Sequence, residues 1–184
     1  MTRVVLVGPP GAGKGTQAAT LSDKLGVSHI STGDLFRKHI NAGTELGKRV
    51  KGILDAGGLV PDELTIELVK ERLAEPDTED GILLDGFPRN VRQADLLNKI
   101  LSERDEKLDV VVELQVNEDT LVRRLLARGR ADDTEDVIRH RQQLYRSETA
   151  PLLDYYRDLL VTVDGTGDVD EVTTLILAAL RDRT

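Results

Sequence analysis

The sequence predicts an α/β fold in which a five-stranded parallel β-sheet is flanked by helices. Two observations predict this class. Short apolar runs rich in β-branched residues recur along the chain, and segments with the apolar spacing of helices lie between them. Strands that alternate with helices form right-handed crossover units, so the strands are expected to run parallel. A third observation, the length of 184 residues, suits a single domain over residues 1–184.

The apolar runs are the predicted strands. Each run is short, and most end near Gly, Asp or Ser, residues that commonly bound strands. The runs are Val4–Val7, Val27–Ile30, Ile82–Leu84, Val110–Leu114 and Leu160–Val163. Three segments between them repeat apolar residues at helical spacing, and we expect helices there. These segments are Thr16–Leu25, Val91–Leu101 and Val172–Leu180.

Two stretches depart from the plain alternation of strands and helices. Residues 31–74 form a long, mainly helical stretch with several glycines, and residues 128–136 are polar and have no apolar period. Folds of this class carry their sites at strand ends, in excursions from the sheet. Both stretches are therefore expected to border the site.

The composition is ordinary for a globular protein, and the absence of cysteine suits a reducing compartment. The chain has no cysteine, which excludes disulfides and a thiolate metal site. No apolar run reaches membrane-spanning length and no leader pattern is found, so a cytoplasmic protein without a membrane partner is expected. The net charge of -8 argues against a nucleic-acid partner. The charge is uneven, however, because seven arginines and only four acids lie between Arg123 and Arg146.

The sequence GPPGAGKGT, residues 8–16, follows the first predicted strand and matches a phosphate-binding loop, or P-loop. Its glycines allow positive φ and a close approach of backbone N–H groups to a phosphate at a helix N-terminus. Lys14 can reach the β- and γ-phosphate oxygens of a nucleoside triphosphate. Gly15 stands where GTPases and transport ATPases place a metal-binding hydroxyl, and the guanine-reading N-K-x-D pattern is missing after Asn98-Lys99.

The run G-x-P-G-x-G-K-G-T resembles the P-loop of nucleoside monophosphate kinases. Three further segments support the resemblance, and the chain is similar to the short-lid adenylate kinases among them. The segments are STGDLFR (31–37), LLDGFPRNVRQA (83–94) and GRADDTEDVIRHR (129–141). The resemblance implies the reaction MgATP + AMP ⇌ 2 ADP, which balances the adenine nucleotides, with ATP, AMP and ADP as partners of a monomer. It also implies an NMP-binding arm at 31–60 and a short lid at 128–136.

Phosphoryl transfer depends on positioning and charge neutralisation, which lysine, arginine and Mg²⁺ provide. The resemblance implies that the catalytic residues are Lys14, Arg89, Arg128, Arg130, Arg141, Asp132 and Asp133. The two aspartates would hold the closed lid and its arginines, or they would cap the helix that begins before Val137. No role is expected for the histidines.

The resemblance also implies a donor site. Arg124 and Arg128 lie four residues apart on a predicted helix and share a face, so Arg128 is expected to hold phosphates and Arg124 to stack on the donor adenine. Backbone groups of the turn after the last strand are expected to read that adenine. The implied ATP-binding residues are Gly11, Ala12, Gly13, Lys14, Gly15, Thr16, Arg124, Arg128 and Gly167.

The implied acceptor site binds AMP. Arg37 and Arg89 follow separate strands and can each fork onto the α-phosphate with two hydrogen bonds. The resemblance implies a cis Phe87–Pro88 peptide bond that aims Arg89 into the site. The implied AMP-binding residues are Thr32, Gly33, Arg37, Gly58, Leu59, Val60, Gly86, Phe87, Pro88, Arg89, Gln93, Arg130 and Arg141.

The expected cofactor is Mg²⁺ with ATP. Asp85 ends a buried strand beside the P-loop and is expected to hold Mg²⁺ through water, with Asp34 as a second candidate. Long-lid relatives sometimes carry a cysteine zinc site. Here only Gly129 separates Arg128 from Arg130 and cysteine is absent, so no zinc is expected.

The base of the acceptor nucleotide is not fixed by this resemblance, and a UMP/CMP kinase with the same chemistry is the alternative. Asn90 leans toward pyrimidines, whereas Thr32 and Gln93 lean toward adenine, because a Gln amide can both donate to and accept from an adenine edge. We give Asn90 only a helix-capping role and favour AMP. A nucleotide-binding switch is a third hypothesis, and the arginine set argues against it because a switch needs no acceptor phosphate site.

Overall fold

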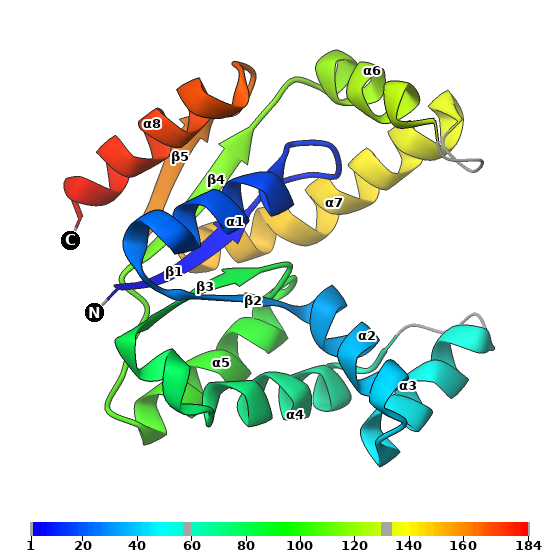
Figure 1. The fold of residues 1–184 in the computed structure, drawn as a ribbon. Coiled ribbons are helices and arrows are strands. Elements are labelled where there is room, and N and C mark those ends of the chain that lie inside the picture. The colour runs from blue at the N-terminus through cyan, green and yellow to red at the C-terminus, as the bar shows by residue number, and fades with distance from the viewer. Residues whose placement is uncertain (1, 57–59, 130–133, 184) are drawn as a thin grey trace.

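The structure is a computed structural model that describes residues 2–56, 60–129 and 134–183, and its centre is one β-sheet (Figure 1). The sheet has five parallel strands in the order β2-β3-β1-β4-β5. The strands are β1 (Thr2–Val7), β2 (Ser28–Ser31), β3 (Gly81–Asp85), β4 (Val110–Gln115) and β5 (Leu160–Asp164). The predicted fold class, an α/β fold with a five-stranded parallel sheet, is confirmed.

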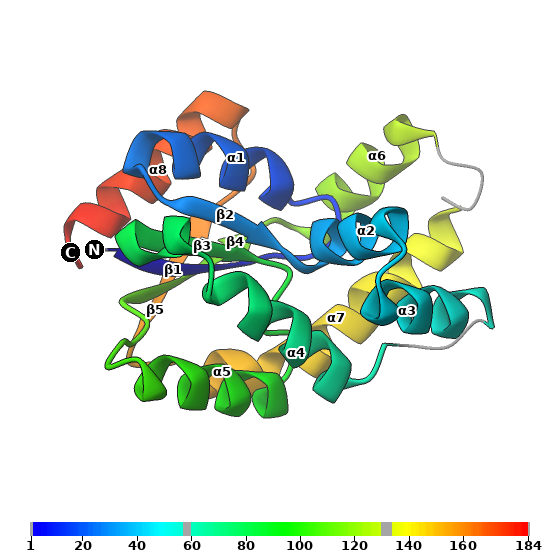
Figure 2. The ribbon, with the colours of Figure 1, turned by 60° about the horizontal axis from the view of Figure 1, so that its bottom comes forward.

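Helices cover both faces of the sheet, and a pair of helices extends beyond one edge (Figures 1 and 2). The helices are α1 (Lys14–Leu25), α2 (Thr32–Ala42), α3 (Glu45–Asp55), α4 (Asp62–Leu73), α5 (Val91–Glu103), α6 (Glu118–Arg128), α7 (Glu135–Tyr155) and α8 (Val169–Arg181), with a short 3₁₀ helix at Pro76–Asp80. Helices α1 and α8 lie on one face, and α5 and α7 lie on the other (Figure 2). No helix within the described residues is both long and apolar enough to span a membrane.

The alternation of side chains along β1 builds two cores at once. Successive residues of a strand point to opposite faces of a sheet. Val5 and Val7 therefore pack into the core under α5 and α7, whereas Val4 and Leu6 pack into the core under α1 and α8. All four are buried, as expected for a central strand covered on both faces.

Strand boundaries agree with the predicted runs to within two residues, and the start of β2 shows one reason why they differ. Val27 was expected in this strand. In the structure its N–H donates to the carbonyl of Ser22 (3.0 Å) and helps to end α1, together with Gly26 at φ 66°. The N–H of Val27 is therefore used by the helix cap and is not available to a neighbouring strand, so β2 begins at Ser28.

The P-loop follows β1 at the carboxyl edge of the sheet. The chain first adds strands on one side of β1 and then adds β4 and β5 on its other side, so the strand order changes direction at β1. The segments after β1 and β3 leave this edge toward opposite faces, because α1 and α5 belong to different cores. Such a reversal opens a crevice outside the carboxyl ends of the strands. In the register of the sheet, Asp85 at the end of β3 lies opposite Leu6, directly beside the P-loop.

Helices α2 and α3 form a hairpin with a small core of its own, in the part of the chain predicted as the arm. Val50 of α3 packs with Leu64 and Leu68 of α4, and Phe36 of α2 packs against them. This cluster is separate from the two cores of the sheet. Residues 57–59 of the predicted arm and 130–133 of the predicted lid lie outside the described residues.

Gly47 of α3 lies close to the backbone of α2, and it yields a matched pair of substitutions. A Cβ at Gly47 would collide with the backbone carbonyl of His39 and would lie 2.8 Å from the N atom of Ile40, whereas a Cβ at Gly52 of the same helix would meet nothing within 4 Å. We expect Gly47→Ala to lower the free energy of unfolding by about 1–3 kcal/mol through overpacking. Gly52→Ala should raise it by about 0.5–1 kcal/mol through helix propensity.

Denaturant unfolding of both variants beside the parent chain measures this difference. Equal stability of the Gly47→Ala and Gly52→Ala variants would show that α2 and α3 are not in close backbone contact.

Candidate active site

The P-loop forms an open cradle in front of α1. Gly11 and Gly13 adopt φ of 87° and 86°, the left-handed region in which glycine has no steric penalty. Gly13 is the N-cap of α1 and supplies no side-chain oxygen to the N–H groups of the first turn. An added Cβ at Gly13 or Gly15 would meet no atom within 4 Å. The space there is open to a ligand, and the free N–H groups favour an anion.

Lys14 stands at the centre of the cradle. Its Nζ lies 3.7 Å from Oδ1 of Asp85, and both side chains are largely buried. Burial lowers the pKa of Lys14 from its ordinary value; Asp85 opposes this shift and the positive charge of Arg89 adds to it. The ammonium group therefore lacks full charge compensation, and a phosphate brought beside it would supply the missing negative charge.

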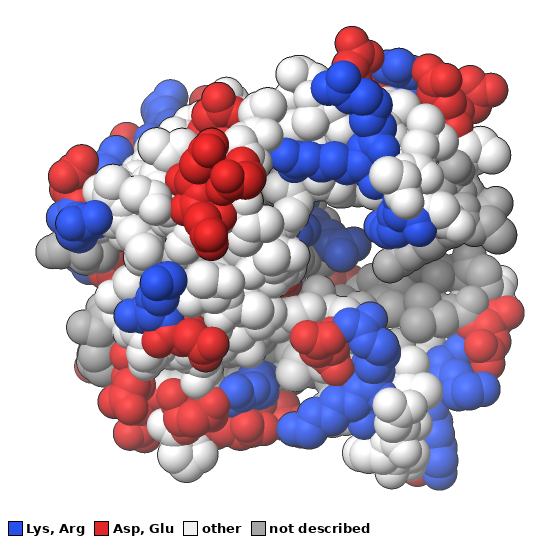
Figure 3. Space-filling view, turned by 45° about the horizontal axis from the view of Figure 1, so that its top comes forward, with Lys and Arg blue, Asp and Glu red and all other residues white. Residues whose placement is uncertain are grey.

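A cavity of about 510 Å³, here named the Lys14 cavity, opens beside the cradle. Lys14, Arg89 and Arg141 line it from three different segments, and Phe87, Leu144 and Leu152 supply apolar wall. In the space-filling view the molecule is hollowed on one side, with Lys and Arg side chains on both sides of the hollow (Figure 3). Acidic side chains are prominent on the rest of the face shown, while Glu148 is the acid that lines the Lys14 cavity together with its three cations.

The loop after β3 brings part of the predicted acceptor site together. The carbonyl of Gly86 accepts from the Thr32 hydroxyl (3.4 Å) and from Nε of Arg89 (3.0 Å). The Phe87–Pro88 bond is cis, as predicted, and both residues are buried. The start of α2 and the loop after β3 therefore meet at one backbone carbonyl, in front of strands that are adjacent in the sheet.

Asn90 and Gln93 have well-defined partners at the start of α5. The side-chain oxygen of Asn90 accepts from the N–H of Gln93 (2.8 Å), which confirms the predicted helix cap. Gln93 is buried, and its Oε1 accepts from the N–H of Arg89 (2.8 Å). Its Nε2 donates to Oδ1 of Asp62 (2.9 Å), a contact that the sequence did not predict.

Arg37 and Asp34, both predicted for the site, form an exposed ion pair on the first turns of α2. The Ser31 hydroxyl caps this helix by accepting from the N–H of Asp34 (3.4 Å). Exposure leaves the Arg37 guanidinium able to turn toward an anionic ligand at little cost. The ion-pair partner of Asp34 is Arg37, whereas Lys14 pairs with Asp85.

Arg124 ties the P-loop to the turn after β5. Its guanidinium donates to the carbonyls of Gly11 (3.3 Å), Gly165 (3.1 Å) and Thr166 (3.1 Å). Arg124 and the turn before Gly167, both predicted for the donor adenine, therefore come together. The sequence predicted that Arg124 stacks on the adenine, and the structure adds its bonds to three backbone carbonyls. At Gly167 an added Cβ would lie 2.5 Å from the Glu171 carboxylate, so a side chain there would disturb the start of α8.

The arginines of the predicted lid are only partly described. Arg128 is the last residue of α6 and is exposed, and Arg141 of α7 lines the Lys14 cavity. Five predicted site residues lie outside the described residues, namely Gly58, Leu59, Arg130, Asp132 and Asp133.

The alternative capping role of the two aspartates is wrong. The N-cap of α7 is Thr134, whose hydroxyl accepts from the N–H of Val137 (3.4 Å). A cap must stand directly before the first helical residue, and α7 begins at Glu135.

Two polar residues of the site, the half-buried His29 and the buried Gln142, were missed from the sequence. His29 of β2 places Nε2 3.4 Å from Oδ2 of Asp85, because β2 and β3 are neighbours in the sheet. Gln142 of α7 is buried and donates to the carbonyl of Pro10 in the P-loop (2.9 Å). A signal for Gln142 was available: it follows Ile138 by four residues on the buried face of α7, where a polar side chain needs a partner.

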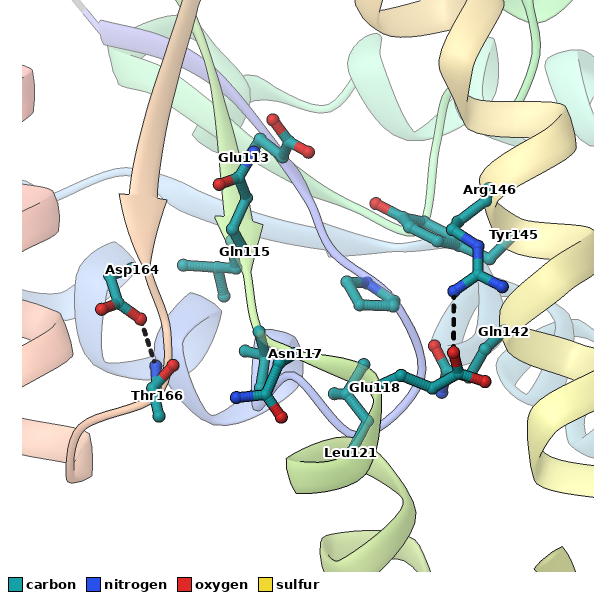
Figure 4. A pocket seen from close by; sticks show the side chains of 13 residues that line it. Glu113, Gln115, Asn117, Glu118, Leu121, Gln142, Tyr145, Arg146, Asp164 and Thr166 are labelled. Atoms are coloured by element: carbon teal, nitrogen blue, oxygen red, sulfur yellow. Dashed lines mark hydrogen bonds and ion pairs between the residues drawn. The ribbon is translucent and has the colours of Figure 1, made fainter.

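A second cavity of about 560 Å³ lies between β4, the start of α6, α7 and the turn after β5 (Figure 4). Glu113, Glu118 and Asp164 line it, and its arginine, Arg146, points at Glu118 and donates to it (3.2 Å). Three acids against one paired arginine repel a polyphosphate. The Lys14 cavity, with one lysine and two arginines against Glu148, fits phosphate better.

A glycine cradle before a helix, a partly desolvated lysine and arginines on facing walls define a P-loop phosphotransferase. The family model described as Adenylate kinase matches residues 6–160. Proteins named Adenylate kinase from Rhodococcus erythropolis, Nocardia farcinica and Mycolicibacterium smegmatis are each 60% identical to this chain over 178 residues, 97% of its length and 98% of theirs.

The chain belongs to the adenylate kinase family. Its reaction is the transfer of a phosphoryl group between ATP and AMP to give two ADP, and the UMP/CMP kinase alternative is not favoured. The family uses Mg²⁺ with ATP.

Proposed function

We propose that the γ-phosphoryl group passes from MgATP to AMP inside the Lys14 cavity, and that the reverse reaction uses the same groups. The observation that carries this proposal is the meeting of Lys14 and Arg89, which come from loops after different strands and line one cavity. Arg89 is close enough to lower the pKa of Lys14. Two repelling cations in a partly desolvated site are stable together when an anion lies between them.

On the donor side, the N–H groups of residues 11–16 and the Lys14 ammonium would hold the β- and γ-phosphates. These donors are already in place in the cradle, so they need not reorganise as charge shifts during transfer. Arg128 would add charge to the donor phosphates from the end of α6. Arg124 and Gly167 would border the donor adenine, supported by the bonds between Arg124 and the carbonyls at Gly165 and Thr166.

On the acceptor side, Arg37 and Arg89 would hold the α-phosphate of AMP with two-pronged hydrogen bonds. Gly33, Gly86 and the buried Phe87–Pro88 pair would shape the pocket between them. Thr32 and Gln93 would face the adenine base, with Val60 on the apolar side. In support, Thr32 and Arg89 share the carbonyl of Gly86 and Gln93 bonds to the backbone of Arg89.

Mg²⁺ would be held near Asp85. This carboxylate is 8% exposed, points at the cradle, and has Lys14 on one oxygen and His29 on the other. Residues 2–56, 60–129 and 134–183 contain no group of three or more His, Cys, Asp or Glu able to cage a metal. This fits an ion that keeps most of its waters and takes phosphate oxygens and one carboxylate as partners. When bound, Mg²⁺ neutralises charge on the transferring phosphates.

Residues 31–60 and 128–136 would act as the arm and the lid that close over the two nucleotides. Closure would exclude water, which would otherwise accept the phosphoryl group and waste ATP. Arg141, which already lines the Lys14 cavity from α7, would contact the phosphates from the lid side together with Arg130. Asp132 and Asp133 would hold the lid arginines. The chain would work as a monomer in the cytoplasm.

A single set of coupled assays tests the reaction. Initial rates at fixed MgATP should be highest with AMP as acceptor, far lower with UMP or CMP, and close to zero with water. Water supplies no acceptor phosphate between Arg37 and Arg89, and UMP and CMP supply that phosphate but lack the adenine that would face Thr32 and Gln93. Preference for UMP or CMP would assign the chain to pyrimidine nucleotides, and hydrolysis without an acceptor would contradict phosphoryl transfer.

Arg37→Ala and Arg89→Ala should separate the acceptor site from the donor site. Each loses hydrogen bonds to a charged group, so we expect KM for AMP to rise about 10–100-fold. Arg89→Ala should also lower kcat, because Arg89 lines the cavity with Lys14. The Kd for ATP should stay close to that of the parent chain.

Arg92→Ala is the matched control for both variants. Arg92 is an exposed arginine three residues after Arg89 and pairs with Glu63 on α4. Its removal should leave KM for AMP unchanged. If Arg37→Ala or Arg89→Ala loses affinity for ATP and keeps its affinity for AMP, the assignment of these arginines to the acceptor site is wrong.

A further inference from the structure

Asp62, the first residue of α4, makes a contact that the proposed function does not use. Its Oδ1 accepts from Nε2 of Gln93 (2.9 Å) and from Nδ2 of Asn90 (3.4 Å). On the opposite end of the same amide, Oε1 of Gln93 accepts from the N–H of Arg89 (2.8 Å). Gln93 is 6% exposed, so little water is available to replace either bond.

These two partners permit one orientation of the Gln93 amide. An ionised carboxylate only accepts hydrogen bonds, and a backbone N–H only donates them. If the amide turned over, Oε1 would face the Asp62 carboxylate and Nε2 would face the Arg89 N–H, so both bonds would become repulsive contacts. In a buried site each lost partner carries the cost of an unpaired polar group.

Asn90 strengthens the same arrangement. Its Oδ1 is committed to the N–H of Gln93 as the cap of α5, so its Nδ2 is the group that faces Asp62. The carboxylate therefore receives two N–H donors from α5 and presents no donor of its own. Asn90 thus supports Asp62, in addition to the capping role expected from the sequence.

The fixed amide still has capacity for a ligand. Nε2 carries a second N–H, and Oε1 has a second lone pair. A 6-aminopurine offers a ring acceptor at N1 beside a donor at its amino group, which matches this donor and acceptor. A 6-oxopurine offers a donor at N1 beside an acceptor at O6, which would match only the overturned amide.

We propose that Asp62 is a specificity-determining positioning residue: it locks the Gln93 amide so that the acceptor site takes a 6-aminopurine and rejects a 6-oxopurine. This inference rests on the proposed function, in which Gln93 faces the base of AMP. Asp62 acts through Gln93 and itself contacts no substrate.

The test compares AMP with IMP, which differ only at the N1 and C6 edge. We expect Asp62→Ala to lower the ratio of kcat/KM for AMP to that for IMP by about 10-fold, the effect of one hydrogen bond to a charged group. Asp62→Asn should give a smaller decrease, because its amide can still turn an oxygen toward Gln93. KM for MgATP should not change. An unchanged AMP-to-IMP ratio in both variants would overturn the proposal.

Glu63→Gln is the matched control. It removes one negative charge from the same first turn of α4 and breaks the ion pair with Arg92, yet Glu63 has no recorded bond to Gln93. Its AMP-to-IMP ratio should equal that of the parent chain. A purely structural role of Asp62 would lower both rates together and leave the ratio unchanged, which would also overturn the proposal. If Asp62→Ala does not fold in thermal melts, the Asp62→Asn ratio decides.

Gln93→Leu separates this inference from the proposed function. If this variant keeps both its KM for AMP and its AMP-to-IMP ratio, Gln93 does not read the base and the proposed acceptor site fails. If Gln93→Leu weakens the use of AMP while Asp62→Ala keeps the parent ratio, the acceptor site stands and only the lock is wrong.

Discussion

The Lys14–Asp85 pair at the carboxyl edge of the sheet is the interaction on which the rest of the site depends. The parallel register of β1 and β3 sets Asp85 opposite Leu6, so its carboxylate reaches 3.7 Å from the Lys14 ammonium. This one acid does not fully compensate Lys14, because burial and Arg89 both lower the pKa of the lysine. The glycine cradle, the two-sided core and the arginines around the cavity can all be understood as holding this electropositive centre open for phosphate.

A chain with net charge -8 builds a basic site by segregating its charges. Many acids lie on the surface shown in Figure 3, and exposed ion pairs such as Lys51–Asp55 and Arg139–Glu135 contribute little to stability. The cations of the site come from segments far apart in sequence: the P-loop, the loop after β3, and α7. Lys14 begins α1, Arg89 lies in the loop after β3 and Arg141 lies within α7. These elements pack into the cores, so folding energy holds the like charges together.

Local patterns in the sequence predicted those parts of the structure that depend on local physics. The glycine loop before a helix, the Asn90 cap and the strand alternation each follow from neighbouring residues. Asp62 could not be found in this way, because Gln93 lies 31 residues further along the chain and meets it only when α4 packs on α5. Periodicity marks Gln142 as a buried position but cannot name its partner Pro10, which lies 132 residues away. The three carbonyls bound by Arg124 are likewise distant along the chain. The cap of α7 was misjudged for a local reason, since Thr134 and not the preceding acids stands next to the first helical residue.

The most direct test of this account is the pKa of the Lys14 side chain, followed by the ¹³Cε chemical shift in a pH titration and assigned by comparison with a Lys14→Met variant. The account predicts a pKa below the ordinary lysine value of 10.5 in the free protein, and a rise when MgATP brings phosphate charge beside the ammonium group. A pKa in the free protein at or above the ordinary value, or no change on adding MgATP, would contradict the claim that Lys14 is a partly uncompensated cation poised for phosphate.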